Sequence, residues 1–254
     1  MTTDPFRLDG RRALVTGGGT GIGLGITTAL VGAGATVAIV GRRPAPLEAA
    51  AEAIGSRVLP FAADVTDLPA VPALLDRVAS MIGTIDLLVN NAGIQGRSPA
   101  LEQDDATTAQ VLSTHIGASM ALSREFAIRL VAASSPGTIV NIGSTSARIG
   151  LPNSPAYAAA KAGLTGLTRA HAAEWGPHKI RVNTVTPGWV LTDMTDVAFK
   201  ADPQRRHKVL ARTPLGGLGS VADIGLAVVY LSSDASAFVT GIDLPIDGGA
   251  AIGF

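Results

Sequence analysis

The 254-residue chain carries 20 lysine and arginine residues against 20 aspartate and glutamate residues, so its formal net charge is zero. Without a broad positive field, we expect it to bind neither nucleic acid nor an anionic membrane. A hydrophobic fraction of 47% and a charged fraction of 16% are typical of a folded globular protein rather than a disordered one. The chain has no cysteine, which excludes disulfides, thiolate metal sites and a cysteine nucleophile.

Targeting segments and metal sites are also disfavoured by the residue pattern. Residues 1–12 contain charged residues and proline where a signal peptide needs an apolar segment, and no later apolar run approaches the length of a membrane span. We therefore expect a cytoplasmic protein with no membrane partner. Three scattered histidines, His171, His178 and His207, show no ligand spacing with carboxylates. We interpret them as surface or helix-end residues and expect no metal.

Short apolar runs alternate with helically spaced segments along the chain. In chain order, the expected strands cover residues 12–16, 35–40, 57–62, 85–89, 138–142 and 181–185. The expected helices cover residues 22–31, 46–54, 68–82, about 104–133, 155–175 and 221–232. The connections between most of these elements are only a few residues long.

This alternation, with strands that are almost entirely apolar, predicts an α/β fold: a single Rossmann-type doubly wound parallel sheet with helices on both faces. No linker, repeat or low-complexity tract divides the chain, so we expect one domain over residues 1–254. The pattern becomes less regular over residues 187–219, where Pro, Gly, Asp and Thr interrupt it. An insertion beyond the carboxyl end of a strand is where a substrate lid would lie.

A glycine-rich turn, Thr16-Gly17-Gly18-Gly19-Thr20-Gly21-Ile22-Gly23, joins the first strand to the first helix. Backbone N–H groups and the helix dipole at such a junction can hold a pyrophosphate, and glycine permits the close approach. Such turns also arise simply to connect elements, and the spacing here differs from G-x-G-x-x-G. Its place at the first βα junction favours a dinucleotide-binding domain. The expected cofactor contacts are Gly17, Thr20, Gly21, Ile22 and Gly23.

The pattern T-G-x-x-x-G-I-G resembles the short-chain dehydrogenase/reductase family, and further motifs of that family follow in order over nearly the whole chain. The resemblance implies that Asp64 and Val65 contact the adenine ring. It also implies that the cofactor approaches the backbone closely at the small residues of Asn90-Asn91-Ala92-Gly93, so that Asn91, Ala92 and Gly93 are expected contacts. Alone, Asp64 would be explained as a turn or helix cap and the tetrapeptide as a turn.

Later motifs extend the resemblance towards the C-terminus. Pro187-Gly188 follows the sixth expected strand, and the resemblance implies that this segment contacts the nicotinamide. The expected contacts are Pro187, Gly188, Val190 and Thr192. Without the other motifs, Pro187-Gly188 would be an ordinary break between strand and loop. Asp247-Gly248-Gly249 matches the family's closing segment and is structural evidence rather than catalytic.

Ser144, Tyr157 and Lys161 form the strongest pattern in the chain. Ser144 follows the expected strand 138–142, while Tyr157 and Lys161 are four residues apart and so share one face of the next helix. A hydroxyl, a phenol and an ammonium can therefore converge. Tyr157-Ala158-Ala159-Ala160-Lys161 is similar to the family's Y-x-x-x-K motif. Such pairs also occur as solvated neighbours on helices, but the preceding motifs favour the catalytic interpretation.

These residue types suit the interconversion of a ketone and a secondary alcohol by hydride transfer. A phenol with a pKa of about 10 is a poor base at neutral pH, and we expect the Lys161 ammonium and the positive nicotinamide to favour the phenolate. Tyr157 then protonates the carbonyl oxygen in reduction and removes the alcohol proton in oxidation, while Ser144 donates a hydrogen bond to that oxygen. The resemblance also implies that Tyr157 and Lys161 contact the cofactor, with Lys161 binding the nicotinamide ribose.

The end of the second strand bears on the choice of cofactor. The chain reads Val40-Gly41-Arg42-Arg43 where an NAD enzyme commonly has an acidic residue. Because Arg42 or Arg43 can pair with a 2′-phosphate, NADP is favoured. NAD is the alternative, since Thr20 stands where many NADP-using members have a basic residue. The resemblance also implies a homo-oligomer, a tetramer, acting on a small-molecule carbonyl or alcohol.

The chain departs from the family pattern at His115, a position that usually carries Asn. That Asn completes a catalytic tetrad by holding a water that links the lysine to solvent. His115 either fills space at a helix bend or replaces the amide in the proton relay, since imidazole can both donate and accept. The departure keeps open a nucleotide-binding regulatory protein with impaired catalysis. An epimerase or dehydratase on the same scaffold is the other alternative.

Further residues are pocket neighbours by chain position alone: Gln95, Arg97, Ser146, Arg148 and Asn153. Trp189, after Pro187-Gly188, either lines the substrate pocket or packs beside the strand end. A basic cluster in the expected lid consists of Arg205, Arg206, His207 and Lys208. We expect this cluster to be a solvated face, with contact to an anionic substrate group as the alternative.

Overall fold

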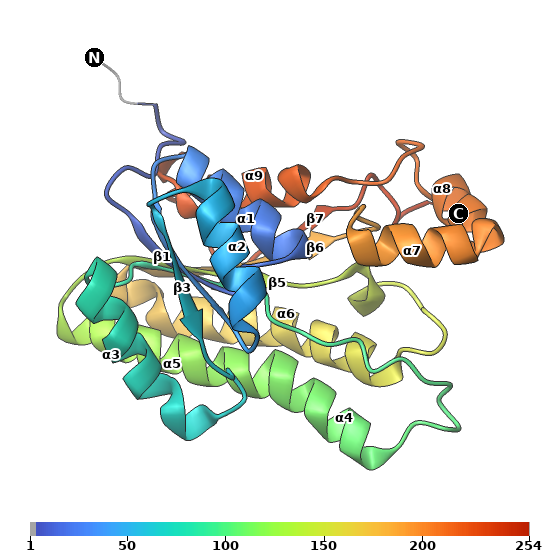
Figure 1. Ribbon diagram of the computed structural model, residues 1–254, viewed down its shortest axis with the longest axis horizontal. Helices are drawn as coiled ribbons and strands as arrows, with labels where there is room; N and C mark the ends of the chain where they lie inside the picture. Colours follow the sequence, from blue (N-terminus) through green and yellow to red (C-terminus); the bar gives the residue numbers. More distant parts are fainter. Residues whose placement is uncertain (1–3, 254) are drawn as a thin grey trace.

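Residues 4–253 form a seven-stranded parallel sheet with the strand order β3-β2-β1-β4-β5-β6-β7 (Figure 1). These are the residues that the computed structural model describes, without the side chains of residues 193, 194 and 198. The strands are β1 (Arg12–Thr16), β2 (Thr36–Gly41), β3 (Val58–Ala62), β4 (Leu87–Asn90), β5 (Gly137–Ile142), β6 (Ile180–Pro187) and β7 (Asp243–Ile246). The order reverses between β1 and β4, which is where doubly wound sheets bind ligands. The predicted fold class is confirmed.

The central strands are apolar because helices cover them on both sides. Val15 of β1 is fully buried and pairs in register with Ile39 of β2 and Val89 of β4. The registers of the parallel strands bring their carboxyl ends to one edge of the sheet. Asn90, at the end of β4, lies opposite Asn141 of β5. Residues that follow these strands therefore meet above the same edge.

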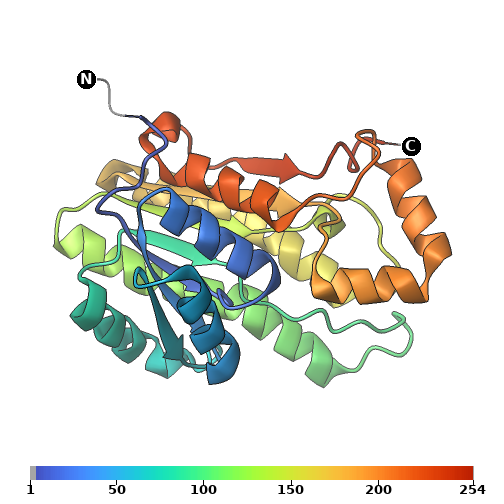
Figure 2. The ribbon, with the colours of Figure 1, turned by 45° about the horizontal axis from the view of Figure 1, so that its top comes forward.

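Helices form a layer on each face of the sheet (Figures 1 and 2). One layer contains α1 (Gly21–Gly32), α2 (Pro44–Ile54) and α9 (Val221–Ser232). The other contains α3 (Val71–Ile82), α4 (Asp105–Leu112), α5 (Ala118–Ala132) and α6 (Pro155–Trp175). Helices α1 and α9 approach so closely that a Cβ on Gly225 would lie 2.7 Å from the Gly25 carbonyl oxygen. Glycine at this crossing lets the two backbones touch.

Shorter turns connect these layers. Single 3-10 turns cover Leu68–Ala70, Thr145–Ala147, Gly176–His178 and Asp234–Ser236. Among the described helices, none has both the length and the apolar character that crossing a membrane requires. No group of three or more His, Asp or Glu side chains within the described residues is arranged to hold a metal ion.

The helix expected over residues 104–133 is interrupted in the structure. A π-helical turn, Ser113–Gly117, separates α4 from α5 and contains the buried His115. Single π turns inside α-helices are frequent at functional sites. The flanking residues Leu112 and Ala118 keep ordinary helical dihedral angles, so the chain stays helical on both sides of the turn.

The segment 187–219 is more regular than expected. It forms α7 (Asp193–Ala201) and α8 (Pro203–Arg212), which lie beyond the carboxyl ends of the strands (Figure 2). The Asp202 side chain caps α8 by accepting from the Arg205 backbone N–H at 2.9 Å, and Pro203 occupies the first helical position. Aspartate followed by proline is a recognised start signal for a helix, and it marks α8 in the sequence.

Candidate active site

A cavity of about 1200 Å³ lies at the carboxyl edge of the sheet, between the strand ends and the helices α7 and α8. Its lining contains most of the residues predicted from motifs. Those residues are Gly17, Thr20, Gly21, Ile22, Gly23, Arg43, Asn91, Ala92, Gly93, His115, Ser144, Tyr157, Lys161, Pro187, Gly188, Val190 and Thr192. Segments far apart in the sequence thus share one cavity.

The glycine-rich turn forms one end of this cavity. Gly17 and Gly21 have positive φ values of 66° and 52°, which favour glycine. The N-terminus of α1 follows, and Thr20, its N-cap residue, makes no side-chain cap hydrogen bond. A Cβ at Gly21 would project towards Thr192, with the Thr192 methyl 3.8 Å away. This small-residue cradle beside a helix N-terminus fits a pyrophosphate.

Asn91 braces the glycine-rich turn. Its side-chain amide donates to the Thr16 carbonyl oxygen at 2.8 Å and to the Gly17 carbonyl oxygen at 3.3 Å. The Thr16 hydroxyl oxygen accepts from the backbone N–H groups of Asn91 and Ala92 at 2.9 and 3.0 Å. These bonds join the end of β1 to the end of β4, so Asn91 positions the turn as well as lining the cavity.

Three predicted cofactor contacts lie outside the cavity lining: Arg42, Asp64 and Val65. Arg42 is exposed just after β2, and Asp64 is exposed after the neighbouring strand β3. One Asp64 carboxylate oxygen accepts from the backbone and hydroxyl of Thr66 at 2.9 and 2.7 Å, which holds the pKa of Asp64 below its usual value. Asp64 therefore stabilises a local turn, which was one of the two interpretations of this residue.

Ser144 and Tyr157 approach each other at the centre of the cavity. The Ser144 side chain caps the 3-10 turn after β5, and its oxygen accepts from the Ser146 backbone N–H at 3.2 Å. Burial raises the pKa of the Tyr157 phenol, and its hydrogen bond with Ser144 lowers the pKa only in part. Burial is thus the larger of the two influences on this pKa.

Lys161 lies beneath Tyr157 on the same face of α6. Its side chain is buried, its Nζ donates to the Ile142 carbonyl oxygen at 2.6 Å, and this nitrogen lies 5.6 Å from the centre of the Tyr157 ring. Burial lowers the pKa of Lys161 to about 7. An ammonium has three donors. Lys161 therefore retains donors that ribose hydroxyls can accept.

His115 is buried against the other site residues. Its ring meets the Tyr157 ring edge-on, with 5.3 Å between the ring centres, and a Cβ at Gly93 would collide with the imidazole. Nε2 lies 2.8 Å from the Ile94 carbonyl oxygen, while Nδ1 is buried and has no hydrogen-bond partner among the described residues. Burial, with a smaller effect of the Lys161 charge, lowers the pKa of His115 to about 4. The imidazole is neutral near pH 7.

The substrate side of the cavity includes several residues that were expected from chain position. Gln95, Arg97, Asn153 and Trp189 line it. Ser146 and Arg148 do not, and Arg148 instead pairs with Asp243 of β7 at 2.9 Å. Within the basic cluster, Arg205 and Lys208 line the cavity and Arg206 and His207 do not. The sequence indicated no role for Leu151 and Val209, which supply apolar surface to the cavity.

The comparisons with known proteins agree with this geometry. Residues 17–251 match the family model described as "Enoyl-(Acyl carrier protein) reductase". Galactitol 2-dehydrogenase (L-tagatose-forming) of Cereibacter sphaeroides is 40% identical over 252 residues, with 97% of each chain covered. The chain belongs to the short-chain dehydrogenase/reductase family.

Other members of the family extend the likeness to sugar acids. The 2-dehydro-3-deoxy-D-gluconate 5-dehydrogenase of Escherichia coli K12 is 36% identical over 250 residues, with 98% of each chain covered. A gluconate 5-dehydrogenase of Burkholderia cenocepacia J2315, solved in complex with NADP and tartrate, is 33% identical with a TM-score of 0.93 and 99% of each chain covered. Like these members, the chain is an oxidoreductase of CH–OH groups that uses a nicotinamide cofactor.

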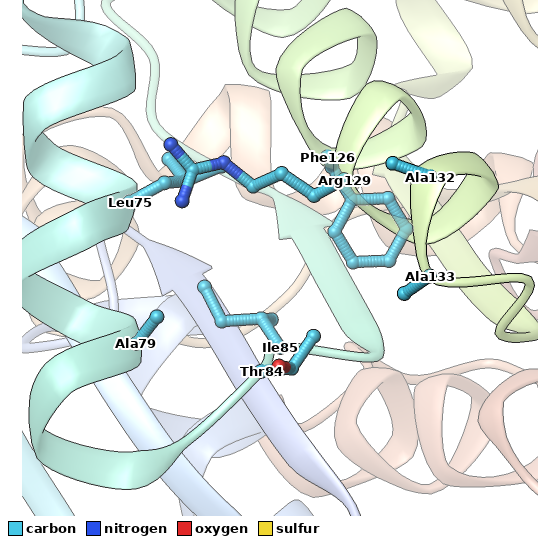
Figure 3. A pocket seen from close by; sticks show the side chains of 8 residues that line it. All are labelled: Leu75, Ala79, Thr84, Ile85, Phe126, Arg129, Ala132 and Ala133. Carbon is cyan, nitrogen blue, oxygen red and sulfur yellow. The ribbon is translucent and has the colours of Figure 1, made fainter.

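A second cavity is unrelated to this site. It has a volume of about 440 Å³ and lies between α3 and α5, next to the residues that precede β4 (Figure 3). It is therefore at the amino edge of the sheet, away from the strand ends that carry Ser144. Its one charged lining residue, Arg129, already pairs with Asp76 at 2.8 Å and with Glu125 at 2.9 Å.

The remaining histidine on α6 has a structural environment. His171 was expected at the surface or at a helix end, but it is half-buried within α6 and stacks on Trp175 with 3.9 Å between the ring centres. Burial lowers the pKa of His171. The four-residue spacing places both rings on one face of the helix, where they shield each other from water.

Proposed function

We propose that the chain is an NADP-preferring dehydrogenase/reductase that interconverts a ketone and a secondary alcohol on a small polyhydroxylated substrate. The convergence of Ser144, Tyr157 and Lys161 in one cavity carries this proposal. The named activities of the galactitol and deoxygluconate relatives support a polyhydroxylated substrate. Initial rates with a panel of ketoses, polyols and sugar acids, measured with both cofactors, test it.

Tyr157 transfers the proton in this proposal, and Ser144 holds the substrate oxygen. The nicotinamide ring, when bound, supplies the hydride in reduction and accepts it in oxidation. Because burial raises the pKa of Tyr157, the phenol is protonated at neutral pH and is ready to act as the acid in ketone reduction. Ser144 donates a hydrogen bond to the oxygen on which negative charge develops. Oxidation requires the phenolate, so its rate rises with pH.

The preference for NADP rests on the end of β2. Arg43 lines the cavity, Arg42 lies beside it, and no carboxylate precedes them on the strand. Arginine can pair with a 2′-phosphate through two parallel hydrogen bonds. The solved gluconate 5-dehydrogenase in complex with NADP supports this choice. The ratio of kcat/KM for NADPH and NADH tests it, and a preference for NADH contradicts it.

His115 acts in this proposal as a positioning residue for Lys161. If Nε2–H donates to the Ile94 carbonyl oxygen, Nδ1 is a buried acceptor, and the Lys161 charge is near enough to lower the pKa of the imidazole. A water held between Nδ1 and Lys161 Nζ would complete a proton path without any titration of the imidazole. If wild-type protein were inactive and His115→Asn restored turnover, the regulatory alternative would be favoured instead.

Assembly and lid movement are further parts of the proposal. Large apolar side chains are exposed on two separate faces, Met120 and Ile128 on α5 and Leu226 and Phe238 on and after α9. Two such faces suit a homotetramer, which light scattering tests. We also propose that α7 and α8 act as a lid within one catalytic domain. Cofactor-dependent protection of α7 and α8 in hydrogen exchange tests the lid.

A further inference from the structure

One wall of the active-site cavity is strongly cationic. Arg205, Lys208 and Arg212 are spaced three and four residues apart on α8, so they form one stripe, and all three line the cavity. Arg97, on the loop after β4, also lines it. The lining contains one carboxylate, Asp202. Since the whole chain has no net charge, this concentration of cations is local.

The cations at the centre of this wall lack partners of opposite charge. Among residues 4–253, the described contacts give Arg97, Arg205 and Lys208 no side-chain hydrogen bond and no ion pair. Arg212 differs, because it donates to the Ala250 carbonyl oxygen at 3.0 Å. The Asp202 carboxylate is engaged as the cap of α8. Donors are therefore free on the cavity side of α8 and on the facing loop.

Arg97 and Arg205 are close enough to influence each other. Partial burial lowers the pKa of Arg205, the Arg97 charge lowers it further, and the Asp202 charge offsets this with a smaller effect. Two arginines from different elements thus face one region of the cavity and repel each other. An anion between them would relieve the repulsion and could accept hydrogen bonds from both guanidinium groups.

The cationic wall belongs to the substrate half of the cavity. The Ser98 backbone N–H, next to Arg97, donates to the Asn153 carbonyl oxygen at 3.1 Å. This bond ties the Arg97 loop to the segment that connects Ser144 with Tyr157. The dinucleotide phosphates have their own cradle at the N-terminus of α1, and Arg43 lies at that end. The wall is therefore free to select the substrate.

We propose that Arg97, Arg205 and Lys208 bind an anionic group of the substrate, so that the enzyme selects a polyhydroxylated acid over an uncharged polyol. The proposal rests on the proposed function and narrows its substrate class. The anion is a carboxylate or a phosphate at the end of the carbon chain remote from the reacting carbon. Arg97 and Arg205 clamp it, and Lys208 adds charge at the mouth of the cavity.

Three six-carbon substrates of matched skeleton test the proposal: D-gluconate, D-glucitol 6-phosphate and uncharged D-glucitol. Initial rates of oxidation are measured for the wild type, Arg205→Gln and Arg97→Gln. Arg206→Gln is the control, because Arg206 lies on α8 outside the cavity lining. The first two substrates distinguish a carboxylate from a phosphate. Rates at low and high ionic strength show whether charge attraction contributes.

We expect the wild type to favour one anionic substrate over D-glucitol by about 10-fold or more in kcat/KM. Arg205→Gln and Arg97→Gln should each raise the KM for that anion by about 10- to 100-fold. The KM for D-glucitol should change little in both variants. Arg206→Gln should leave the KM for the anion unchanged. Salt should raise the KM for the anion alone. Equal use of all three substrates, or equal losses for charged and uncharged substrates, would overturn the proposal.

Absence of turnover with all three substrates would count against the proposed function, and binding then tests the wall separately. Calorimetric titration of D-gluconate and D-glucitol 6-phosphate into the NADP-loaded enzyme is the measurement. The cationic wall is supported if the wild type binds either anion but not D-glucitol, and if Arg205→Gln no longer binds that anion. No binding of either anion overturns it.

Discussion

The floor and the rim of the active-site cavity differ in how the protein holds their side chains. The floor consists of Ser144, Tyr157 and Lys161, fixed by buried contacts with strand ends and with one another. The rim consists of Arg43 at one end and Arg97 and Arg205 at the other, and among the described residues none of the three forms an ion pair. A buried group can be held to a fraction of an ångström, whereas an exposed charge acts over several ångströms.

This difference assigns separate tasks to the two regions. Proton transfer needs atoms within hydrogen-bond distance, so it belongs to the floor. Selection by charge tolerates mobile side chains, so it belongs to the rim. Changes in the floor should lower kcat with every substrate and cofactor. Changes in the rim should alter KM and selectivity and leave kcat almost unchanged.

The largest effect should come from removing the proton-transferring oxygen of the floor. In Tyr157→Phe, kcat should fall by at least about 100-fold, because the ring still packs but no acid or base remains. Cofactor affinity, measured by fluorescence titration, should change little. Tyr230→Phe is the matched control, since Tyr230 lies on α9 outside the cavity lining. Ordinary turnover by Tyr157→Phe would contradict the role given to this residue.

The rim at the cofactor end should control the choice between NADP and NAD. In Arg43→Glu, kcat/KM for NADPH should fall by about 10- to 100-fold through KM, because a carboxylate repels the 2′-phosphate. The value for NADH should stay the same or rise. Arg206→Glu makes the same charge change outside the cavity lining and serves as control. If both cofactors lost activity equally, Arg43 would be structural.

Much of the floor and of the fold could be predicted from short sequence patterns. The apolar runs predict the strands, and the four-residue spacing places Tyr157 and Lys161 on one helix face. The sequence did not indicate which buried polar groups pair. Asn90 donates to the Asn141 side-chain oxygen at 2.8 Å, and Asn141 donates to Thr168 at 2.8 Å. These pairs come from β4, β5 and α6, and only tertiary packing brings them together.

The pKa values of the floor and the role of the rim could not be predicted for the same reason. An ammonium four residues from a phenol suggests a lowered pKa for Tyr157, but burial has the larger effect and raises it. The Arg205 to Lys208 cluster suggested a solvated face, yet the pitch of α8 turns only Arg205 and Lys208 of the four into the cavity. Sequence spacing predicts which side chains share one face of a helix. It does not predict how deeply those side chains are buried or which other element packs against them.

The burial of Lys161 should make the free energy of unfolding depend on pH. Burial lowers the pKa of Lys161 to about 7 in the folded state, while the unfolded chain keeps the usual value. Between these two pKa values the unfolded state binds more protons, so folding stability rises with pH in that window. One proton corresponds to a slope of up to about 1.4 kcal/mol per pH unit.

Lys161→Met removes this contribution while retaining most of the packing. We expect urea unfolding from about pH 6 to about pH 10 to show that the free energy of unfolding of the wild type increases with pH relative to that of Lys161→Met. The advantage of the variant should therefore be greatest in acid, where the wild type must bury a cation. Parallel stability curves for the two proteins would show that Lys161 is not desolvated as the structure indicates. Lys179→Met, an exposed lysine, is the control.

The smallest effect at neutral pH should come from His115, which packs against Tyr157 beside the floor but transfers no proton to the substrate. Because burial lowers the pKa of His115 to about 4, the imidazole is neutral at pH 7. His115→Asn then replaces one neutral group by another that can also hold a water. We expect kcat to change by no more than about threefold, well under the effect of losing an acid.

In acid the two proteins should diverge. The unfolded chain takes up the His115 proton near its usual pKa of about 6.5, whereas the folded protein resists it down to about 4, so stability falls as the pH drops through this window. His115→Asn lacks this group and should retain both stability and kcat at lower pH. Thermal unfolding and kcat, measured on both proteins from about pH 4 to about pH 7, separate loss of fold from loss of turnover. A wild-type ionisation near neutrality that disappears in His115→Asn would instead mean that the imidazole itself carries the relayed proton.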